Sequence, residues 1–157
     1  MIQRIQSIFL FISAVVLILV LFLPIWSSST AGTYNMLLDA LSLKMLDPAG
    51  NVLKTETTVF ITALATLGAI NSLYTIFKFR KRKTQIKLGL LNLVVNLLLI
   101  GSFIYAIKVG QDLLGNNQWG MMQAGFFMPF ISIICTLFAN HYIRKDEKLV
   151  RSVDRLR

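Results

Sequence analysis

The side chains of this chain that could do chemistry inside a membrane are three asparagines placed in strongly apolar blocks. Asn92 and Asn96 are four residues apart, so they share one face of a helix, and Asn71 lies at a similar depth in the preceding block. Amides at such positions need hydrogen-bond partners, because lipid supplies none. One interpretation is an interhelical clamp in which Asn71 reaches Asn92 or Asn96. The other is a polar groove that binds a lipid headgroup or a quinone.

A proline adds a fourth residue to this candidate groove. Pro129 lies midway along the last apolar block. Proline lacks an N–H and its ring clashes with the preceding helical turn, so it predicts a kink. A kink can border a binding cleft, although helix packing also explains it. The predicted interhelical or ligand contacts are therefore Asn71, Asn92, Asn96 and Pro129.

No pattern in the sequence resembles an active site. The chain has no Walker loop, HExxH, GxSxG or dinucleotide fingerprint. No Asp, Glu, Lys or Arg lies deep in an apolar block, which disfavours a proton relay or an ion-coupled transporter. The single cysteine, Cys135, and the single histidine, His141, have no partners nearby in sequence for catalysis or metal binding. We therefore expect no catalytic residue, metal or cofactor, and a protein that is not an enzyme.

The elements that position these residues are apolar blocks of about 20 residues, the length of a helix that spans a bilayer core of ~30 Å. Of the 157 residues, 55% are hydrophobic and only 15% are charged, below the roughly one quarter typical of soluble domains. The sequence thus predicts a single all-α membrane domain over residues 1–157 with four transmembrane helices. Their expected bounds are residues 5–26, 57–77, 88–107 and 120–140.

The orientation follows from the positive charges. With the N-terminus in the cytoplasm, the cytoplasmic segments hold 13 Lys and Arg residues and the outer loops hold three. This asymmetry predicts that both termini are cytoplasmic. The net charge is +9, and nearly all charged residues flank the apolar blocks. We therefore expect contact with anionic lipids and no nucleic-acid binding. The predicted lipid contacts lie around the loop after the second block: Lys78, Arg80, Lys81, Arg82, Lys83 and Lys87.

The outer, periplasmic loop at residues 27–56 is the largest segment between the blocks. Turn-forming residues at 47–51, Asp-Pro-Ala-Gly-Asn, separate two stretches with strand character. A β-hairpin of residues 43–46 against 52–55 is expected. A short interfacial helix at residues 37–44 is the alternative.

The tail at residues 141–157 has the pattern of a basic amphipathic helix. It can extend the fourth span along the membrane surface or dock onto a partner protein. The residues of its apolar stripe, and thus the predicted docking residues, are Leu149, Val150, Val153 and Leu156.

The start of the chain resembles a known family. Residues 1–6 read Met-Ile-Gln-Arg-Ile-Gln, and the apolar span that follows ends Leu-Phe-Leu-Pro-Ile-Trp at residues 21–26. These features, with the basic loop, resemble a bacterial family of small four-span inner-membrane proteins known only as a domain of unknown function. The resemblance implies location in a bacterial inner membrane. It implies no activity, cofactor or catalytic residue.

Two functions follow as hypotheses. The first is a non-catalytic accessory or scaffold subunit of a larger inner-membrane complex, with a membrane-protein partner. The second is a lipid- or quinone-binding protein that uses the polar groove between the second, third and fourth spans. A homo-oligomeric pore is a third possibility, disfavoured because the spans lack polar faces.

Overall fold

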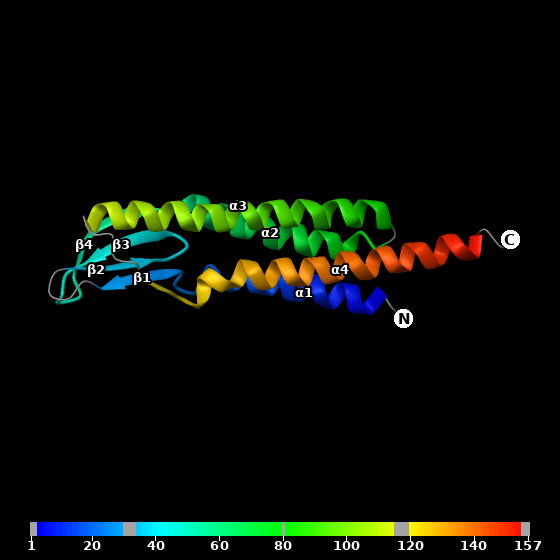
Figure 1. Ribbon diagram of the computed structural model, residues 1–157, viewed down its shortest axis with the longest axis horizontal. Coiled ribbons are helices and arrows are strands. Elements are labelled where there is room, and N and C mark those ends of the chain that lie inside the picture. The colour runs from blue at the N-terminus through cyan, green and yellow to red at the C-terminus, as the bar shows by residue number, and fades with distance from the viewer. Residues whose placement is uncertain (1–2, 30–33, 80, 115–119, 155–157) are drawn as a thin grey trace.

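Helices and a small sheet divide the chain into two parts that lie end to end (Figure 1). The computed structural model describes residues 3–29, 34–79, 81–114 and 120–154. The helices are α1 (Gln3–Leu19), α2 (Val59–Phe77), α3 (Arg82–Leu114) and α4 (Ala124–Asp154). The strands are β1 (Trp26–Ser29), β2 (Asn35–Leu38), β3 (Ser42–Leu46), β4 (Val52–Thr57) and β5 (Met121–Met122).

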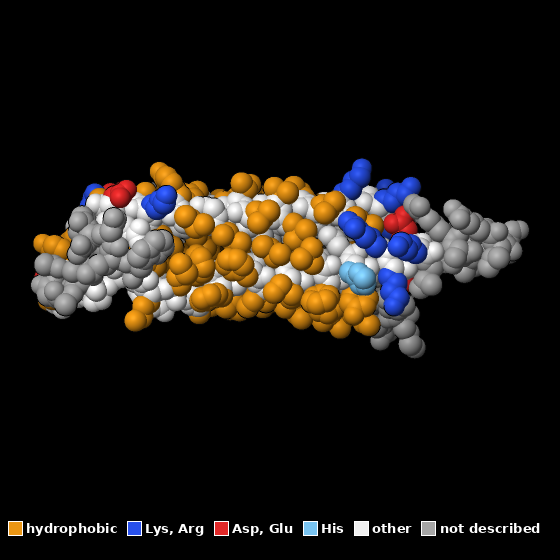
Figure 2. Space-filling model, in the orientation of Figure 1, with side chains coloured by type: hydrophobic (Ala, Val, Ile, Leu, Met, Phe, Trp, Pro, Cys, Tyr) orange, Lys and Arg blue, Asp and Glu red, His pale blue; other side chains and the backbone are white. Residues whose placement is uncertain are grey.

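The helices pack side by side, with α1 against α2 and α4, and α3 against α2 and α4. α1 and α3 run away from the end that holds both chain termini, and α2 and α4 return to it (Figure 1). Large apolar side chains remain exposed on all four helices. On the face that Figure 2 shows, they form a belt across the middle of the molecule, and most of the visible Lys and Arg side chains lie toward one end. An apolar belt of this kind faces lipid, and the chain is a membrane protein.

The expectation of an all-α protein with four spans is wrong. An antiparallel sheet of five strands, in the order β4-β3-β2-β1-β5, lies at the end opposite the termini (Figure 1). Among the described residues, three helices are long and apolar enough to cross a membrane: Val59–Phe77, Arg82–Leu113 and Ala124–Lys148. α1 has only 17 residues, a length of about 26 Å at 1.5 Å per residue, and is therefore not among these three helices.

The predicted block bounds fail where the apolar sequence continues outside the helices. Block 5–26 overruns α1, because Pro24 disfavours helix at the residue before it and Trp26 pairs with Leu38 of β2. Block 57–77 begins in β4, and block 120–140 begins with β5. Block 88–107 is shorter than α3 at both ends. Hydropathy does not distinguish a buried strand from a membrane helix over such short stretches.

The hairpin predicted within the outer loop is confirmed. β3 and β4 pair in antiparallel register, with Lys44 opposite Thr55 and Met45 opposite Lys54. In the turn, the Gly50 N–H donates to the Asp47 carbonyl over 2.8 Å, and Gly50 has φ +83°. Glycine adopts this left-handed conformation without the steric cost of a side chain. The alternative helix at residues 37–44 does not form, because β2 and β3 occupy those residues.

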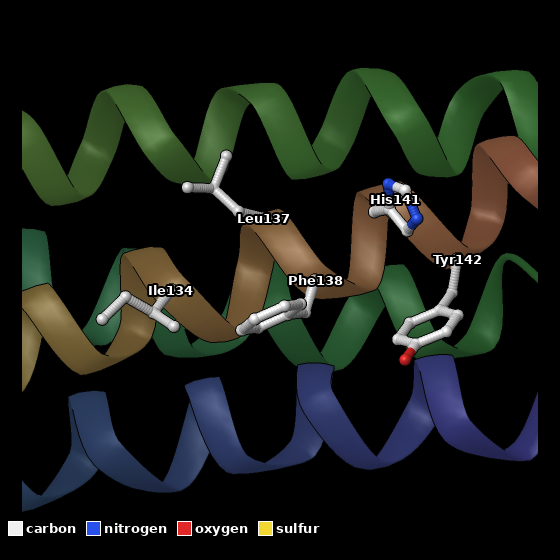
Figure 3. A pocket seen from close by; sticks show the side chains of 5 residues that line it. All are labelled: Ile134, Leu137, Phe138, His141 and Tyr142. Carbon is white, nitrogen blue, oxygen red and sulfur yellow. The ribbon is translucent and has the colours of Figure 1, made fainter.

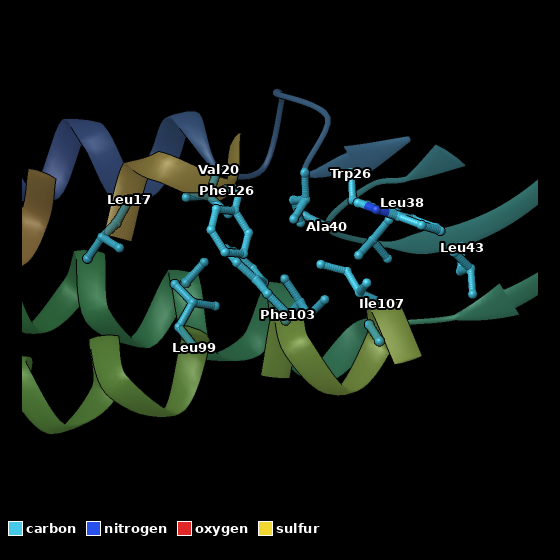
Figure 4. Packing of buried hydrophobic residues seen from close by; sticks show 14 of the residues in the cluster. Leu17, Val20, Trp26, Leu38, Ala40, Leu43, Leu99, Phe103, Ile107 and Phe126 are labelled. Carbon is cyan, nitrogen blue, oxygen red and sulfur yellow. The ribbon is translucent and has the colours of Figure 1, made fainter. Parts of the chain in front are cut away.

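A buried apolar cluster joins the sheet to the helices (Figure 4). Trp26 of β1 is 1% exposed, and Leu38 of β2 and Phe103 of α3 are fully buried. The Phe103 and Phe126 rings lie 6.1 Å apart and connect α3 to the start of α4. Because residues of strands and helices share this cluster, the sheet is fixed to the end of the helical part.

Candidate functional site

Asn92 is the centre of a buried cluster of polar side chains to which all four helices contribute. Its partners are Ser13 of α1, Ser72 of α2 and Thr136 of α4, with Ser132 of α4 one contact further. All five side chains are at most 1% exposed. We refer to these five residues as the polar cluster.

The hydrogen bonds of the polar cluster link every pair of helices that pack against each other. The Asn92 Nδ2 donates to Ser72 Oγ over 2.9 Å, to Thr136 Oγ1 over 3.1 Å and more weakly to Ser13 Oγ over 3.4 Å. Ser13 Oγ lies 2.8 Å from Ser132 Oγ and 3.3 Å from Ser72 Oγ. Each interhelical bond of this kind contributes about 0.6 kcal/mol and at most about 2 kcal/mol in a membrane protein. Together these bonds favour one arrangement of the four helices.

A nucleophile needs an adjacent base, and the polar cluster does not provide one. The partners of the Ser13 hydroxyl are three other hydroxyls and the Asn92 amide. None of these groups takes up a proton near neutral pH. The contacts of the polar cluster therefore serve to hold the helices together.

Two asparagine oxygens in this region lack a hydrogen-bond partner. Asn92 Oδ1 and Asn96 Oδ1 are both buried and unpaired. A Cβ added at Gly68 of α2 would lie only 2.9 Å from Leu17 Cδ1 of α1, so the glycine lets these two helices approach closely, whereas Asn92 Oδ1 would be at an ordinary contact distance of 3.6 Å. The two oxygens are the acceptors that a small ligand or a water molecule could use.

The structure separates the asparagines that the sequence suggested as one set. Asn71 Nδ2 donates to the Leu88 carbonyl over 3.0 Å, so it joins α2 to α3 but is not a hydrogen-bond partner of the Asn92 or Asn96 side chain. Asn96 Nδ2 donates to the Asn92 carbonyl within α3. Pro129 lies inside the continuous helix α4 and is buried. The clamp exists, but Ser13, Ser72 and Thr136 replace Asn71 and Asn96 as the partners of Asn92.

A second buried amide lies on the basic side of the polar cluster. Asn140 of α4 is 5% exposed, and neither its oxygen nor its nitrogen has a partner. Its amide occupies the space beside Gly89 of α3, where an added Cβ would collide with it. Gln6 Nε2 of α1 is likewise buried and unpaired. The helix contacts on this side therefore combine close approach with unsatisfied polar groups.

The basic residues of the predicted lipid contacts lie at the α2–α3 connection. Lys81, Lys83 and Lys87 are exposed. Lys78 Nζ lies 4.9 Å above the Tyr74 ring, and Arg82 Nη2 lies 3.4 Å from Asp146 Oδ2 of α4. Arg80 is outside the described residues, as are Leu156 and the side chains of Leu149, Val150 and Val153 of the predicted docking stripe.

Two adjoining grooves on the outer face of α4 were not predicted from the sequence. The first, here the apolar groove, has a volume of about 510 Å³ and is shown in Figure 3. It is lined by Ile134, Leu137, Phe138, His141 and Tyr142. The second, here the cationic groove, has a volume of about 600 Å³ and is lined by His141, Arg144, Lys145 and Lys148. Asn71, Asn92, Asn96 and Pro129 line neither groove.

The described residues contain no group of three or more His, Cys, Asp or Glu side chains that could hold a metal ion. Cys135 is a free, buried thiol on α4. His141 is exposed and stacks edge-on against Tyr142, with ring centroids 5.8 Å apart.

Sequence reasoning missed the hydroxyl members of the polar cluster. The only sequence signal for these hydroxyls is one that they share, because each is a small polar residue within an apolar block: Ser13, Ser72, Ser132 and Thr136. Serine and threonine are common in membrane helices because their hydroxyls can bond to the backbone of their own helix. Their convergence depends on helix rotation and register, which the pattern of one helix does not determine.

These features define the class of the protein: a small membrane protein whose antiparallel helices are joined through a buried polar cluster and carry a five-stranded sheet at one end. A family model described as a domain of unknown function (DUF4293) matches residues 2–156, and the chain belongs to this family. The expected membership in a family known only as a domain of unknown function is thereby confirmed. No curated protein matches the chain.

Proposed function

We propose that the protein is a non-catalytic accessory or scaffold subunit of a larger complex in a bacterial inner membrane. In this proposal both termini lie in the cytoplasm and the sheet lies in the periplasm. The excess of Lys and Arg in the segments at the terminal end supports this orientation.

The observation that carries the proposal is the edge of the sheet, where no strand among the described residues pairs with the outer side of β4. β4 is an edge strand, and all of its residues except Glu56 are exposed. Val52 and Leu53 are each 55% exposed, although they lie outside the apolar belt. An exposed strand edge with apolar side chains is a template for an added strand from another chain. The partner we infer is a membrane protein that supplies an extended periplasmic segment to β4.

The interior of the helical part supports the same function. The polar cluster stabilises one packing of the helices through neutral hydrogen bonds. A scaffold needs such a fixed arrangement to present its binding edge in one orientation. The Lys54–Glu56 ion pair, at 2.8 Å, adds charges to this edge that limit nonspecific pairing.

The test is photocrosslinking in cells with a photoreactive amino acid at Leu53. We expect one discrete adduct with a single membrane protein, which mild-detergent purification should also recover in stoichiometric amount. The matched control is the same amino acid at Asp112, which is exposed near the sheet end of α3 but is not part of β4. A monomeric product without adduct, or equal adducts from both positions, contradicts the proposal.

The second candidate function is lipid or quinone binding within the helices. The unpaired oxygens of Asn92 and Asn96 favour it, since a quinol or lipid hydroxyl could donate to them. Native mass spectrometry of the purified protein would then show a retained ligand, and the N92L/N96L double variant would lose it. Retention by the double variant assigns both asparagines to packing alone.

A further inference from the structure

The apolar and cationic grooves on α4 form one continuous surface. They share His141, and their lining residues recur at intervals of three and four along the helix, so they lie on one face. Ile134, Leu137 and Phe138 are each about half exposed. Figure 2 shows the histidine where the hydrophobic belt meets the Lys and Arg side chains. The surface therefore changes from apolar to cationic along α4.

The apolar groove has aromatic walls that are held in place. The Phe9 ring of α1 stacks on Phe138 at 5.5 Å and on Tyr142 at 5.8 Å between ring centroids. In Figure 3, Phe138 and Tyr142 lie on the α1 side of α4, whereas Leu137 and His141 lie on the α3 side. A groove with two rows of side chains can hold an extended hydrocarbon chain with little loss of side-chain freedom on binding.

The cationic groove suits a phosphate. Arginine and lysine are the side chains that bind phosphate groups, through directed N–H donors and through charge. Asp146 lies on the same turns of α4 but is directed to Arg82 of α3, with Oδ2 3.4 Å from Nη2, and does not line the groove. The volume of about 600 Å³ is within the usual range for small-molecule sites.

We propose that this face of α4 binds one anionic glycerophospholipid. Its phosphate contacts Arg144, Lys145 and Lys148, and an acyl chain lies in the apolar groove along Leu137 and Phe138. His141 marks the level of the glycerol backbone. The site differs from the basic α2–α3 loop, whose residues line neither groove, and it does not depend on the scaffold function.

The test is native mass spectrometry of the full-length protein titrated with phosphatidylglycerol and, in parallel, with phosphatidylcholine of identical acyl chains. The variant is R144Q/K145Q/K148Q. The matched control is K81Q/K83Q/K87Q, which removes the same charge from exposed positions at the same end of the molecule. We expect the first variant to weaken phosphatidylglycerol binding roughly ten-fold or more and the control by less than about two-fold.

A second variant tests the acyl-chain part independently of charge. Leu137→Trp fills the apolar groove at a half-exposed position and should weaken phosphatidylglycerol binding without changing the thermal unfolding temperature. If the two charge variants lose phosphatidylglycerol binding equally, binding reflects only general attraction between cationic residues and anionic lipid, and the proposal is overturned. Equal binding of the two lipids, or unchanged binding by L137W, also overturns the proposal.

Discussion

The side-chain nitrogen of Asn92 on α3 donates to the hydroxyl of Ser72 on α2 over 2.9 Å, and both side chains are at most 1% exposed. The same nitrogen reaches Thr136 of α4 over 3.1 Å. One amide on α3 thus links α3 to both α2 and α4. If these hydrogen bonds were broken, lipid could not supply replacements.

Replacing Asn92 with leucine should therefore destabilise the protein. We expect Asn92→Leu to lower the free energy of unfolding by about 1–2 kcal/mol, since the hydroxyls keep some bonds to one another. Equilibrium unfolding in mild detergent measures this change in the free energy of unfolding. The matched control is Thr66→Val, because the Thr66 hydroxyl bonds only to carbonyls of its own helix α2, and its loss should cost under about 0.5 kcal/mol. Equal stability of the two variants would show that the polar cluster does not clamp the helices.

Gly89 should not tolerate a side chain. A Cβ there would collide with the buried amide of Asn140, so we expect Gly89→Ala to destabilise the protein by about 1–3 kcal/mol. Gly101 lies on the same helix with nothing within 4 Å of an added Cβ, and Gly101→Ala should be neutral or stabilising by up to about 1 kcal/mol. Thermal unfolding of both variants checks this. Because the collision is with one side chain, Asn140→Ala should rescue the Gly89 variant, and a failure to rescue contradicts the assigned contact.

The Arg82–Asp146 ion pair should couple α3 to α4 where the helices leave the apolar belt. Arg82 also donates from Nη1 to the Asp146 carbonyl over 3.1 Å. We expect a double-mutant cycle of Arg82→Gln and Asp146→Asn to give a coupling energy of about 0.5–1 kcal/mol that decreases at high salt. Lys83→Gln, at an exposed neighbouring position, should leave stability within about 0.5 kcal/mol of the parent protein. A salt-independent or zero coupling argues against the pair.

The proposed orientation predicts which residues are labelled from outside the cell. In a background with Cys135→Ala, which removes the single native cysteine, Asn51→Cys in the β3–β4 turn should react with a membrane-impermeant maleimide on intact cells. Lys81→Cys, exposed at the opposite end, should react only after lysis. The reverse labelling pattern would place the sheet in the cytoplasm.

Some elements were predictable because their signals are local. The turn residues at 47–51 and the strand-like stretches on either side predict the β3–β4 hairpin. The structure contains this hairpin, with a register shift between Met45 and Leu46 that the sequence did not predict. The segments now seen as α2, α3 and α4 were visible as apolar blocks. The failures are at block ends, where Trp26 and Met122 are as apolar as a membrane helix but pair with each other in the sheet.

The site was predictable only in part. The sequence singled out Asn92 correctly as a residue that needs a buried partner, because an amide inside an apolar block has few alternatives. It assigned the wrong partners, because Asn71 at a similar depth is rotated so that its amide meets the Leu88 carbonyl. Rotation about the helix axis is set by the packing of all four helices, and no single block encodes it.

The sequence by itself determined that this is a membrane protein, which segments form the long apolar helices, and where the hairpin turns. These properties depend on residues close together in the chain, through hydropathy and turn conformation. Only the tertiary structure decided that β1 pairs with β5, that Ser13 meets Asn92 across 79 positions, and that two grooves adjoin on α4. Those relationships arise when helices and strands pack together, because packing fixes rotation, register and close approach between distant segments.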